Sequence, residues 1–280
     1  LGQAVTSIFT RETDHELILT SAEDSSFLEY GHEYSTLDIT SKEDVKKLIA
    51  FHEPDIIINC AAFTNVDKCE TERELSWKIN VDGVKNLIIA AKKINSKIIH
   101  FSTDYIFDGK NGPYTELSKP NPVSFYGRGK LASENALITS DINFAIIRTL
   151  VLYGIGNKVK QNFALWVIEE LRNNRPVNIV TDQISNVTMI DDLAYGTLKI
   201  AEMDVSGIYN ISGPDILSRY DFVLKLCEVF NYNKELVRPV TTASLKQPAP
   251  RPLNSGLIIL KAQSELGFNP MDSLEGLRLL

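Results

Sequence analysis

Residues 55–60 (DIIINC) decide the fold, because the three central positions are all isoleucine and leave no polar face. A strand that is apolar on both faces is typical of a parallel sheet with helices on either side. Similar apolar runs lie at 97–101 and 144–148, and helical patterns at 72–94 and 126–138 separate the three. This alternation predicts an α/β fold with a doubly wound, Rossmann-like parallel sheet. An α+β domain with antiparallel strands is the alternative, but βαβ crossovers connect these runs more simply.

Shorter elements surround this central pattern. The central pattern is preceded by a strand pattern at 15–19 and a helical pattern at 42–51. After Arg148, helical patterns lie at 162–173, 190–201 and 218–230, and strand patterns lie at 177–180 and 208–211. A proline-rich connection follows at 239–252. The looser rhythm after Arg148 predicts a smaller, mixed C-terminal substrate domain. We place a dinucleotide-binding domain at 1–148 and a substrate-binding domain at 149–280. The segment at about 181–205 is expected to return to the first domain.

Charge and composition argue against several classes of protein. The net charge of −7 disfavours binding to polyanions, so we expect neither nucleic acid nor a membrane as a partner. The longest apolar runs are far shorter than a membrane span. Three cysteines and four scattered histidines show no metal-ligand spacing, so we expect no metal site. Unpaired cysteines favour a reducing compartment, and we expect a cytoplasmic location.

Tyr126 and Lys130 form a Tyr-x-x-x-Lys pair. Residues four apart share one face of a helix, and a cation beside a phenol favours the phenolate and lowers its pKa. Such a phenol can donate a proton to a carbonyl that is being reduced. Tyr195 and Lys199 show the same spacing. We interpret that second pair as structural, because no hydroxyl at a strand end precedes it.

Polar and small residues follow the predicted strands at the edge where a parallel sheet binds its ligand. Ser102-Thr103-Asp104-Tyr105 ends the strand at 97–101, and a hydroxyl there can hold a carbonyl near the phenol. Alternatively, these hydroxyls only satisfy loop amides. The small residues of Asn59-Cys60-Ala61-Ala62 allow a flat ligand to approach the backbone closely, although tight helix packing needs them too. Asp38-Ile39 could flank an adenine ring.

The glycine-rich phosphate loop that opens such a sheet does not appear in full. Leu1-Gly2-Gln3 looks like the end of that loop and the start of its helix, with Gly2 as the last glycine. The alternative is that the protein lacks a dinucleotide site. We expect that a first strand and glycine loop are missing ahead of Leu1, because a parallel sheet without its central strand would expose two unpaired edges.

Three blocks together resemble the dTDP-4-dehydrorhamnose reductases, which are extended short-chain dehydrogenase/reductases. The blocks are 59–70 (NCAAFTNVDKCE), 102–109 (STDYIFDG) and 126–134 (YGRGKLASE), and 148–149, 181–183 and 251–255 continue the similarity. The resemblance implies a nucleotide-sugar reductase that uses NADP or NAD. A homodimer is a further expectation.

The resemblance also implies roles for individual residues. Thr103, Tyr126 and Lys130 fall on the catalytic positions; Val66, Asp104 and Tyr105 fall on positions that line the sugar pocket. Substrate-binding residues are therefore expected to be Val66, Thr103, Asp104, Tyr105, Tyr126 and Arg251. Cofactor-binding residues are expected to be Gly2, Gln3, Asp38, Ile39, Cys60, Ala61, Ala62, Tyr126 and Lys130, with Lys130 holding the nicotinamide ribose.

The chain departs from the family pattern in two informative places. Val151 stands where the family usually has a tryptophan that packs on the substrate, which leaves the exact sugar open. The second strand ends in Thr20-Ser21-Ala22, without the acidic residue that favours NAD, so NADP is slightly favoured.

Two other functions are compatible with the same blocks. The blocks also resemble the regulatory β subunit of methionine adenosyltransferase, which implies a non-catalytic, dinucleotide-binding partner protein. A nucleotide-sugar epimerase or dehydratase is the other alternative. A dehydratase usually has an acidic pair in place of Asp104-Tyr105, and this chain has only one acid there.

Overall fold

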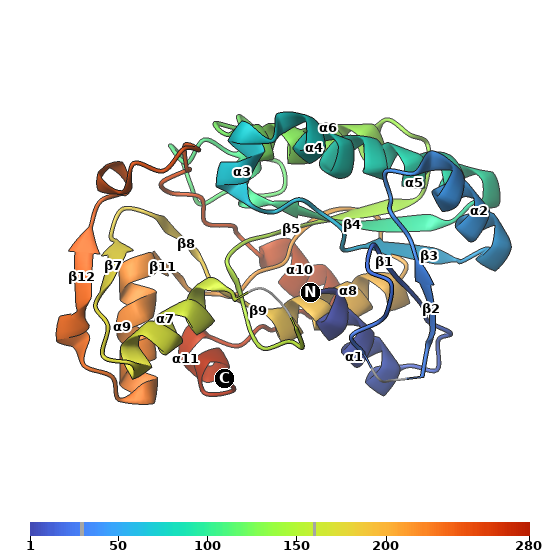
Figure 1. Ribbon diagram of the computed structural model, residues 1–280. Coiled ribbons are helices and arrows are strands. Elements are labelled where there is room, and N and C mark those ends of the chain that lie inside the picture. The colour runs from blue at the N-terminus through green and yellow to red at the C-terminus, as the bar shows by residue number, and fades with distance from the viewer. Residues whose placement is uncertain (29–30, 159–160) are drawn as a thin grey trace.

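The computed structural model describes residues 1–28, 31–158 and 161–280. Its central sheet has four parallel strands in the order β10-β5-β4-β3, namely β10 (Gly207–Asn210), β5 (Phe144–Thr149), β4 (Lys97–Thr103) and β3 (Ile56–Asn59) (Figure 1). All seven residues of β4 are buried, as expected for an inner strand that is covered on both faces. The predicted doubly wound parallel sheet is confirmed.

The first two strands stand apart from that sheet. Among the described residues, β1 (Ile18–Ser21) and β2 (Glu33–Thr36) form a separate parallel pair. The predicted strand at 15–19 therefore begins three residues later than expected. The first element of the structure is the helix α1 (Gly2–Glu12), which begins at the predicted last glycine of the phosphate loop.

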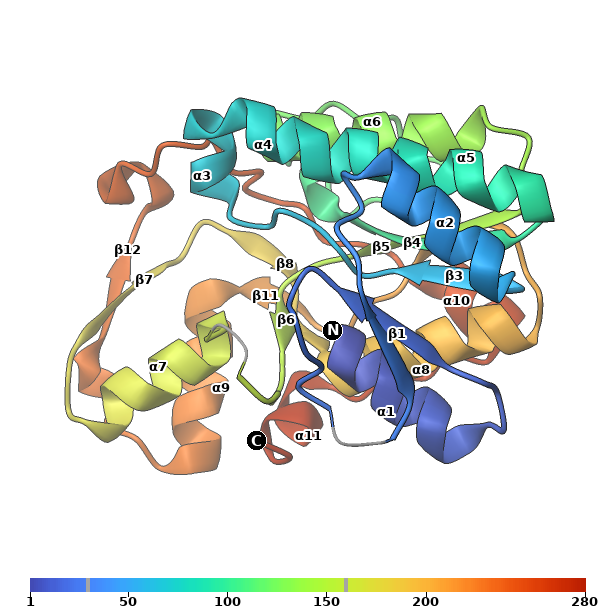
Figure 2. The same ribbon diagram turned by 45° about the vertical axis from the view of Figure 1, so that its right-hand side comes forward.

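Helices cover both faces of the sheet. On one face lie α2 (Lys42–His52), α5 (Val84–Ile94) and α6 (Phe125–Ile138); on the other lie α1, α8 (Ile190–Glu202) and α10 (Leu260–Leu266). Figure 2 shows α1 and α8 together below the sheet, with α2, α5 and α6 above it. Alternate residues of β4 divide between the two cores, since Ile98 packs on the first face and Ile99 on the second.

The long helical pattern at 72–94 is interrupted in the structure. It consists of α4 (Arg73–Trp77), a π-helical turn (Lys78–Gly83) and α5, and the short helix α3 (Val66–Thr71) precedes it. The π turn lies against Ile39, and a Cβ on Gly83 would come within 2.7 Å of the Ile39 side chain. This close contact ties the turn to the loop after β2.

A second group of elements has its own core. It includes the strand pairs β6 (Leu152–Tyr153) with β9 (Thr188–Met189), β7 (Val177–Val180) with β12 (Val237–Val240), and the antiparallel β8 (Ile184–Asn186) with β11 (Ile216–Ser218), and the helices α7 (Phe163–Arg172), α9 (Arg219–Phe230) and α11 (Ser273–Leu277). Phe222 of α9 and Val167 of α7 are fully buried in this core. We call this group the second lobe.

Part of the chain beyond Arg148 packs on the first sheet. α8 contacts α1, β10 pairs with β5, and α10 packs beside both. We propose a domain boundary between residues 148 and 149. The elements α8, β10 and α10 follow that boundary in the chain but pack with the first sheet. Residues 239–252, expected to be a connection, contain the end of β12 and a short 3-10 helix (Thr242–Leu245). In the described ranges, none of the helices has the length and apolar character needed to cross a bilayer.

Candidate active site

Tyr126 is positioned by an unusually close approach of α6 to the end of β4. The Ser124 side chain caps α6 by accepting a hydrogen bond from the Gly127 backbone N–H at 3.1 Å. At Gly127 a Cβ would lie 2.1 Å from the carbonyl oxygen of Tyr105, so only glycine fits. The first turn of α6 is thereby held against the 3-10 helix Asp104–Ile106 that follows β4.

This approach brings the predicted hydroxyl and phenol together. The Thr103 hydroxyl donates to Asp104 Oδ1 at 3.0 Å, and it also lies next to the Tyr126 phenol and influences its pKa. Burial, together with the nearby Asp104, raises the pKa of Tyr126 above its ordinary value of 10.0, while the Thr103 contact lowers it. The expected lowering of this pKa by Lys130 was wrong, because desolvation of the buried phenol dominates and the nearest strong charge is the negative one of Asp104. Tyr126 is a protonated phenol, the form that a proton donor needs.

Lys130 is buried on the next turn of α6. Only 2% of the residue is exposed, and its Nζ lies 3.2 Å from Nε2 of His100. Burial lowers the pKa of Lys130 from 10.5 to about 8, while Glu134 opposes that shift. In the part of the chain that the structure describes, no carboxylate lies within ion-pair distance of this ammonium, so its remaining N–H donors are available to a ligand.

His100 forms the support behind Lys130. Its Nδ1 lies 3.1 Å from Asn59 Nδ2, and its Nε2 lies 3.1 Å from Ser133 Oγ. Burial, followed by the positive charge of Lys130, lowers the pKa of His100 well below 6.5, so the ring is neutral. The sequence argument did not select this residue. His100 could have been found from its position in the strand, because it lies two residues before Ser102 and therefore on the same face of β4, toward α6.

A buried ion pair fixes α6 to β5. The Arg148 guanidinium donates to both carboxylate oxygens of Glu134, at 3.1 and 2.8 Å, and both side chains are at most 3% exposed. Arg148 also donates to the Glu116 carbonyl at 3.1 Å. Since Glu134 lies one turn after Lys130, this pair sets the position of the helix that carries the phenol and the ammonium.

The residues expected to line the sugar pocket lie close by. The Tyr105 and Tyr126 rings pack edge to face, with centroids 5.6 Å apart. Arg251 donates to both oxygens of Asp67, at 2.7 and 2.8 Å, and also to the Ala249 carbonyl at 2.6 Å. Val66 is partly buried at the start of α3, next to Asp67. Arg251 therefore reaches the predicted pocket, but its charge is already paired.

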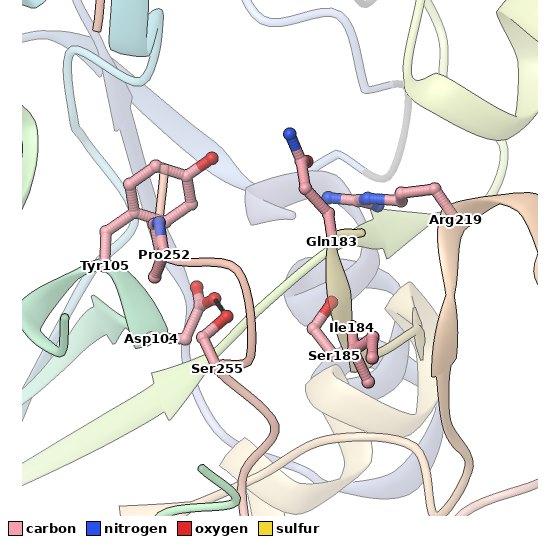
Figure 3. A pocket seen from close by; sticks show the side chains of 8 residues that line it. All are labelled: Asp104, Tyr105, Gln183, Ile184, Ser185, Arg219, Pro252 and Ser255. Carbon is pink, nitrogen blue, oxygen red and sulfur yellow. Dashed lines mark hydrogen bonds between the residues drawn. The ribbon is translucent and has the colours of Figure 1, made fainter. Parts of the chain in front are cut away.

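A cavity lies between this edge of the sheet and the second lobe. Asp104, Tyr105, Pro252 and Ser255 line one side, and Gln183, Ile184, Ser185 and Arg219 line the other (Figure 3). The Ser255 hydroxyl donates to Asp104 Oδ2, so both carboxylate oxygens of Asp104 are hydrogen-bonded. Burial raises the pKa of Asp104 from 3.8 to about 6, although its hydrogen bonds oppose the shift. Sequence reasoning did not find Arg219 or Gln183.

The residues expected to bind a dinucleotide form a second group near the start of α1. A Cβ on Gly2 would lie 3.7 Å from Cys60 Cβ, so the beginning of α1 lies beside the end of β3. Ala61 is exposed, and Ala62 is partly exposed. Gln3 exchanges two hydrogen bonds of 2.8 Å with the backbone of Asn157.

These residues fit a dinucleotide. The side chain before α1 makes no cap hydrogen bond, which leaves backbone N–H groups at the helix start for a phosphate. Small exposed residues lie beside that start, and Lys130 keeps free donors for ribose hydroxyls.

Two further pairs from the sequence analysis, Asp38-Ile39 and Tyr195 with Lys199, have the following surroundings. Asp38 is exposed and accepts hydrogen bonds from the backbone and hydroxyl of Thr40, while Ile39 is buried. Tyr195 is 40% exposed, and its ring lies 5.1 Å from Lys199 Nζ. That cation–π contact supports the structural interpretation of the second Tyr–Lys pair.

The sheet and the hydroxyl, phenol and ammonium near its carboxyl edge define a short-chain dehydrogenase/reductase type of α/β protein. The family described as "RmlD substrate binding domain" matches residues 1–279, and the chain belongs to this family. The resemblance to dTDP-4-dehydrorhamnose reductases is thereby confirmed.

Two relatives and one solved structure illustrate the similarity. The chain is 36% identical over 253 residues to a dTDP-4-dehydrorhamnose reductase of Aggregatibacter actinomycetemcomitans, covering 86% of this chain and 85% of the relative. It is 30% identical over 230 residues to methionine adenosyltransferase 2 subunit beta of Xenopus laevis, covering 80% and 69%. A crystal structure of dTDP-4-dehydrorhamnose reductase from Bacillus anthracis in complex with NADP superposes with a TM-score of 0.83 at 30% identity, covering 93% and 96%.

Proposed function

We propose that this protein reduces the 4-keto group of a nucleotide-linked deoxy sugar, with NADPH or NADH as the reductant. The observation that carries the proposal is that the Thr103 hydroxyl, which donates to Asp104, lies next to the buried Tyr126 phenol at the carboxyl end of β4. The proposal fits the dTDP-4-dehydrorhamnose reductases of Aggregatibacter actinomycetemcomitans and Bacillus anthracis, the second of which was solved with NADP. NADP is the favoured cofactor because β1 ends in Thr20-Ser21.

The roles of the side chains follow from their chemistry. When bound, NAD(P)H would supply the hydride for the carbonyl carbon. The Thr103 hydroxyl turns its hydrogen from Asp104 to the substrate carbonyl and holds that carbonyl beside Tyr126. Tyr126 gives its phenolic proton to the oxygen as negative charge develops there, which the raised pKa of the buried phenol permits. Most of the acceleration comes from placing these donors around one carbonyl.

Lys130 has two functions in this proposal. Its free N–H donors hold the ribose of the dinucleotide next to the substrate. Its positive charge also stabilises the phenolate that remains after Tyr126 gives up its proton. His100 fixes the position of the Lys130 ammonium at 3.2 Å.

Turnover of the expected substrate tests the proposal. The protein is mixed with dTDP-4-keto-6-deoxy-L-mannose and NADPH, or NADH in a parallel sample, and the absorbance of the reduced nicotinamide is followed. We expect substrate-dependent oxidation of the cofactor. If neither cofactor is oxidised while both bind, the proposed reaction is wrong.

A regulatory binding protein is the second candidate, because the chain is also similar to methionine adenosyltransferase 2 subunit beta. This candidate predicts dinucleotide binding without turnover, together with co-purification of a larger enzyme. A pull-down combined with the turnover assay separates the two candidates. The Thr103, Tyr126 and Lys130 side chains favour the reductase, since a purely regulatory protein does not need them.

The cellular location and the oligomeric state are two further parts of the proposal. We propose a cytoplasmic location, because Cys60, Cys69 and Cys227 all carry free thiols. We also propose a homodimer. Leu75 and Trp77 of α4 are 44% and 37% exposed and provide apolar surface for it. Light scattering on the eluted protein decides between one copy and two.

A further inference from the structure

Asn59 is a buried residue at the end of β3 whose side chain has a fixed orientation. It is 5% exposed, and its Oδ1 accepts a hydrogen bond from the backbone N–H of Ala61 at 3.1 Å. Because a backbone N–H can only donate, the amide oxygen must point toward Ala61. The amide nitrogen, Nδ2, therefore points toward His100 and lies 3.1 Å from Nδ1 of its ring.

This orientation decides which ring nitrogen of His100 carries the proton. The Asn59 amide nitrogen is a donor, so Nδ1 of His100 must accept from it. Burial and the charge of Lys130 hold the pKa of His100 well below 6.5, and a neutral imidazole has a single N–H. The proton is therefore on Nε2, where Ser133 Oγ lies 3.1 Å away and can accept it. The Ser133 hydroxyl gives its own hydrogen to the Lys130 carbonyl at 2.7 Å, which leaves its oxygen free to accept.

The proton on Nε2 changes the meaning of the contact with Lys130. Nζ of Lys130 lies 3.2 Å from Nε2, but both atoms carry hydrogen, so neither can accept from the other. With a pKa of about 8, Lys130 is an ammonium at neutral pH. No other group among the described residues hydrogen-bonds Nζ, so its N–H donors have no acceptor within that part of the chain. Such a group is costly to bury, and the hydroxyls of a bound ribose would satisfy it.

We infer that Asn59 is a positioning residue of the proposed reductase, because it keeps the proton of His100 on Nε2 and so reserves the donors of Lys130 for the dinucleotide. This role rests on the proposed function, from which the task of Lys130 is taken. The opposite tautomer, with the proton on Nδ1, would make Nε2 an acceptor. Lys130 would then use one donor within the protein, and the ribose would lose it.

Nuclear magnetic resonance of the wild-type protein tests the tautomer directly. The full chain is produced with isotopically labelled histidine, and the signals of His100 are assigned by comparison with His100→Leu, since the chain has four histidines. We expect a long-range proton–nitrogen spectrum with a protonated Nε2 and an unprotonated Nδ1 at neutral pH. A protonated Nδ1 would overturn the inference. Because this measurement needs no change at Asn59, it decides the question even if the substitutions below disturb folding.

Asn59→Asp reverses the tautomer with almost no change in shape. A carboxylate only accepts, so Nδ1 should take the proton and Nε2 should accept from Lys130. The spectrum should then show a protonated Nδ1, and NADPH affinity measured by calorimetry should fall about tenfold, as for one lost charge-assisted hydrogen bond. Wild-type affinity in this variant would overturn the inference. A lower affinity with an unchanged tautomer would overturn it too.

A new negative charge at position 59 also repels the phosphates of NADPH, and a double-mutant cycle separates that effect. Asn59→Asp is measured again in the His100→Leu background, where no imidazole can transmit a change of tautomer. We expect the tenfold loss to shrink to less than about twofold there. An equal loss in both backgrounds would mean that Asn59 does not act through His100, and the inference would be overturned.

The inference and the proposed function fail in different ways, because none of these measurements uses a sugar. If the spectra and NADPH affinities are as expected but no sugar nucleotide is turned over, the reductase proposal is wrong, and Asn59 still positions Lys130 for the cofactor. If turnover is observed while the wild type carries its proton on Nδ1, only the role of Asn59 is wrong.

Discussion

Replacing Glu134 by glutamine should destabilise the protein strongly, although the two side chains have nearly the same shape. The change leaves the Arg148 guanidinium, whose side chain is 3% exposed, without its anionic partner. Removing one member of a buried ion pair costs about 3–5 kcal/mol in the free energy of unfolding. Arg148 keeps its hydrogen bond to the Glu116 carbonyl at 3.1 Å, so we expect a loss of about 3 kcal/mol, at the lower end.

Thermal unfolding followed by circular dichroism measures this loss. For a chain of this size, 3 kcal/mol corresponds to a decrease of roughly 6–12 °C in the melting temperature. Glu170→Gln is the matched control, because Glu170 forms an ion pair with Arg175, which is 50% exposed. Such exposed pairs contribute little to stability, because water and salt screen them. Equal melting temperatures for the two variants would refute the reasoning.

The remaining predictions concern the site. Tyr126→Phe should lower turnover by orders of magnitude while leaving NADPH affinity nearly intact, because the phenol acts only on the carbonyl; unchanged turnover removes it from the mechanism. His100→Leu should weaken NADPH binding by about tenfold, since Lys130 loses its fixed position; equal affinity by calorimetry contradicts the supporting role. The pKa of Asp104 is raised to about 6, so the folded chain binds more protons than the unfolded chain between pH about 4 and 6. This group therefore removes about 2–3 kcal/mol of stability as the pH rises through that window. In urea titrations at several pH values, the free energy of unfolding of Asp104→Asn should decrease less between pH about 4 and 6 than that of the wild type. An identical pH dependence in both proteins would contradict the raised pKa of Asp104.

The sequence allowed the central sheet to be predicted because its strands are continuous apolar runs. Residues 56–59 and 97–101 could be recognised from composition alone, since strands covered by helices on both faces are rich in apolar residues. β6 and β9 have two residues each, which is too short for any periodic pattern. The shift of β1 to Ile18–Ser21 has a similar cause, because its flanking residues carry no strong end signal.

The catalytic positions could be predicted, but their electrostatics could not. Tyr126 and Lys130 were identified from spacing and from the strand end that precedes them. The direction of the Tyr126 pKa shift depends on burial, which no local pattern gives. The pairing of Arg251 with Asp67 joins residues 184 positions apart, which no local pattern reveals. Long-range packing therefore decides whether the charge of Arg251 is paired within the protein.

The central claim is that a hydride and the Tyr126 proton meet at the C4 carbonyl of a nucleotide-linked sugar. Mass spectrometry tests it most directly, after a reaction with NADPH deuterated at the transferable position and dTDP-4-keto-6-deoxy-L-mannose. We predict one deuterium at C4 of the sugar with wild type and almost none with Tyr126→Phe. Deuterium at another carbon, or equal incorporation by both proteins, would contradict the account.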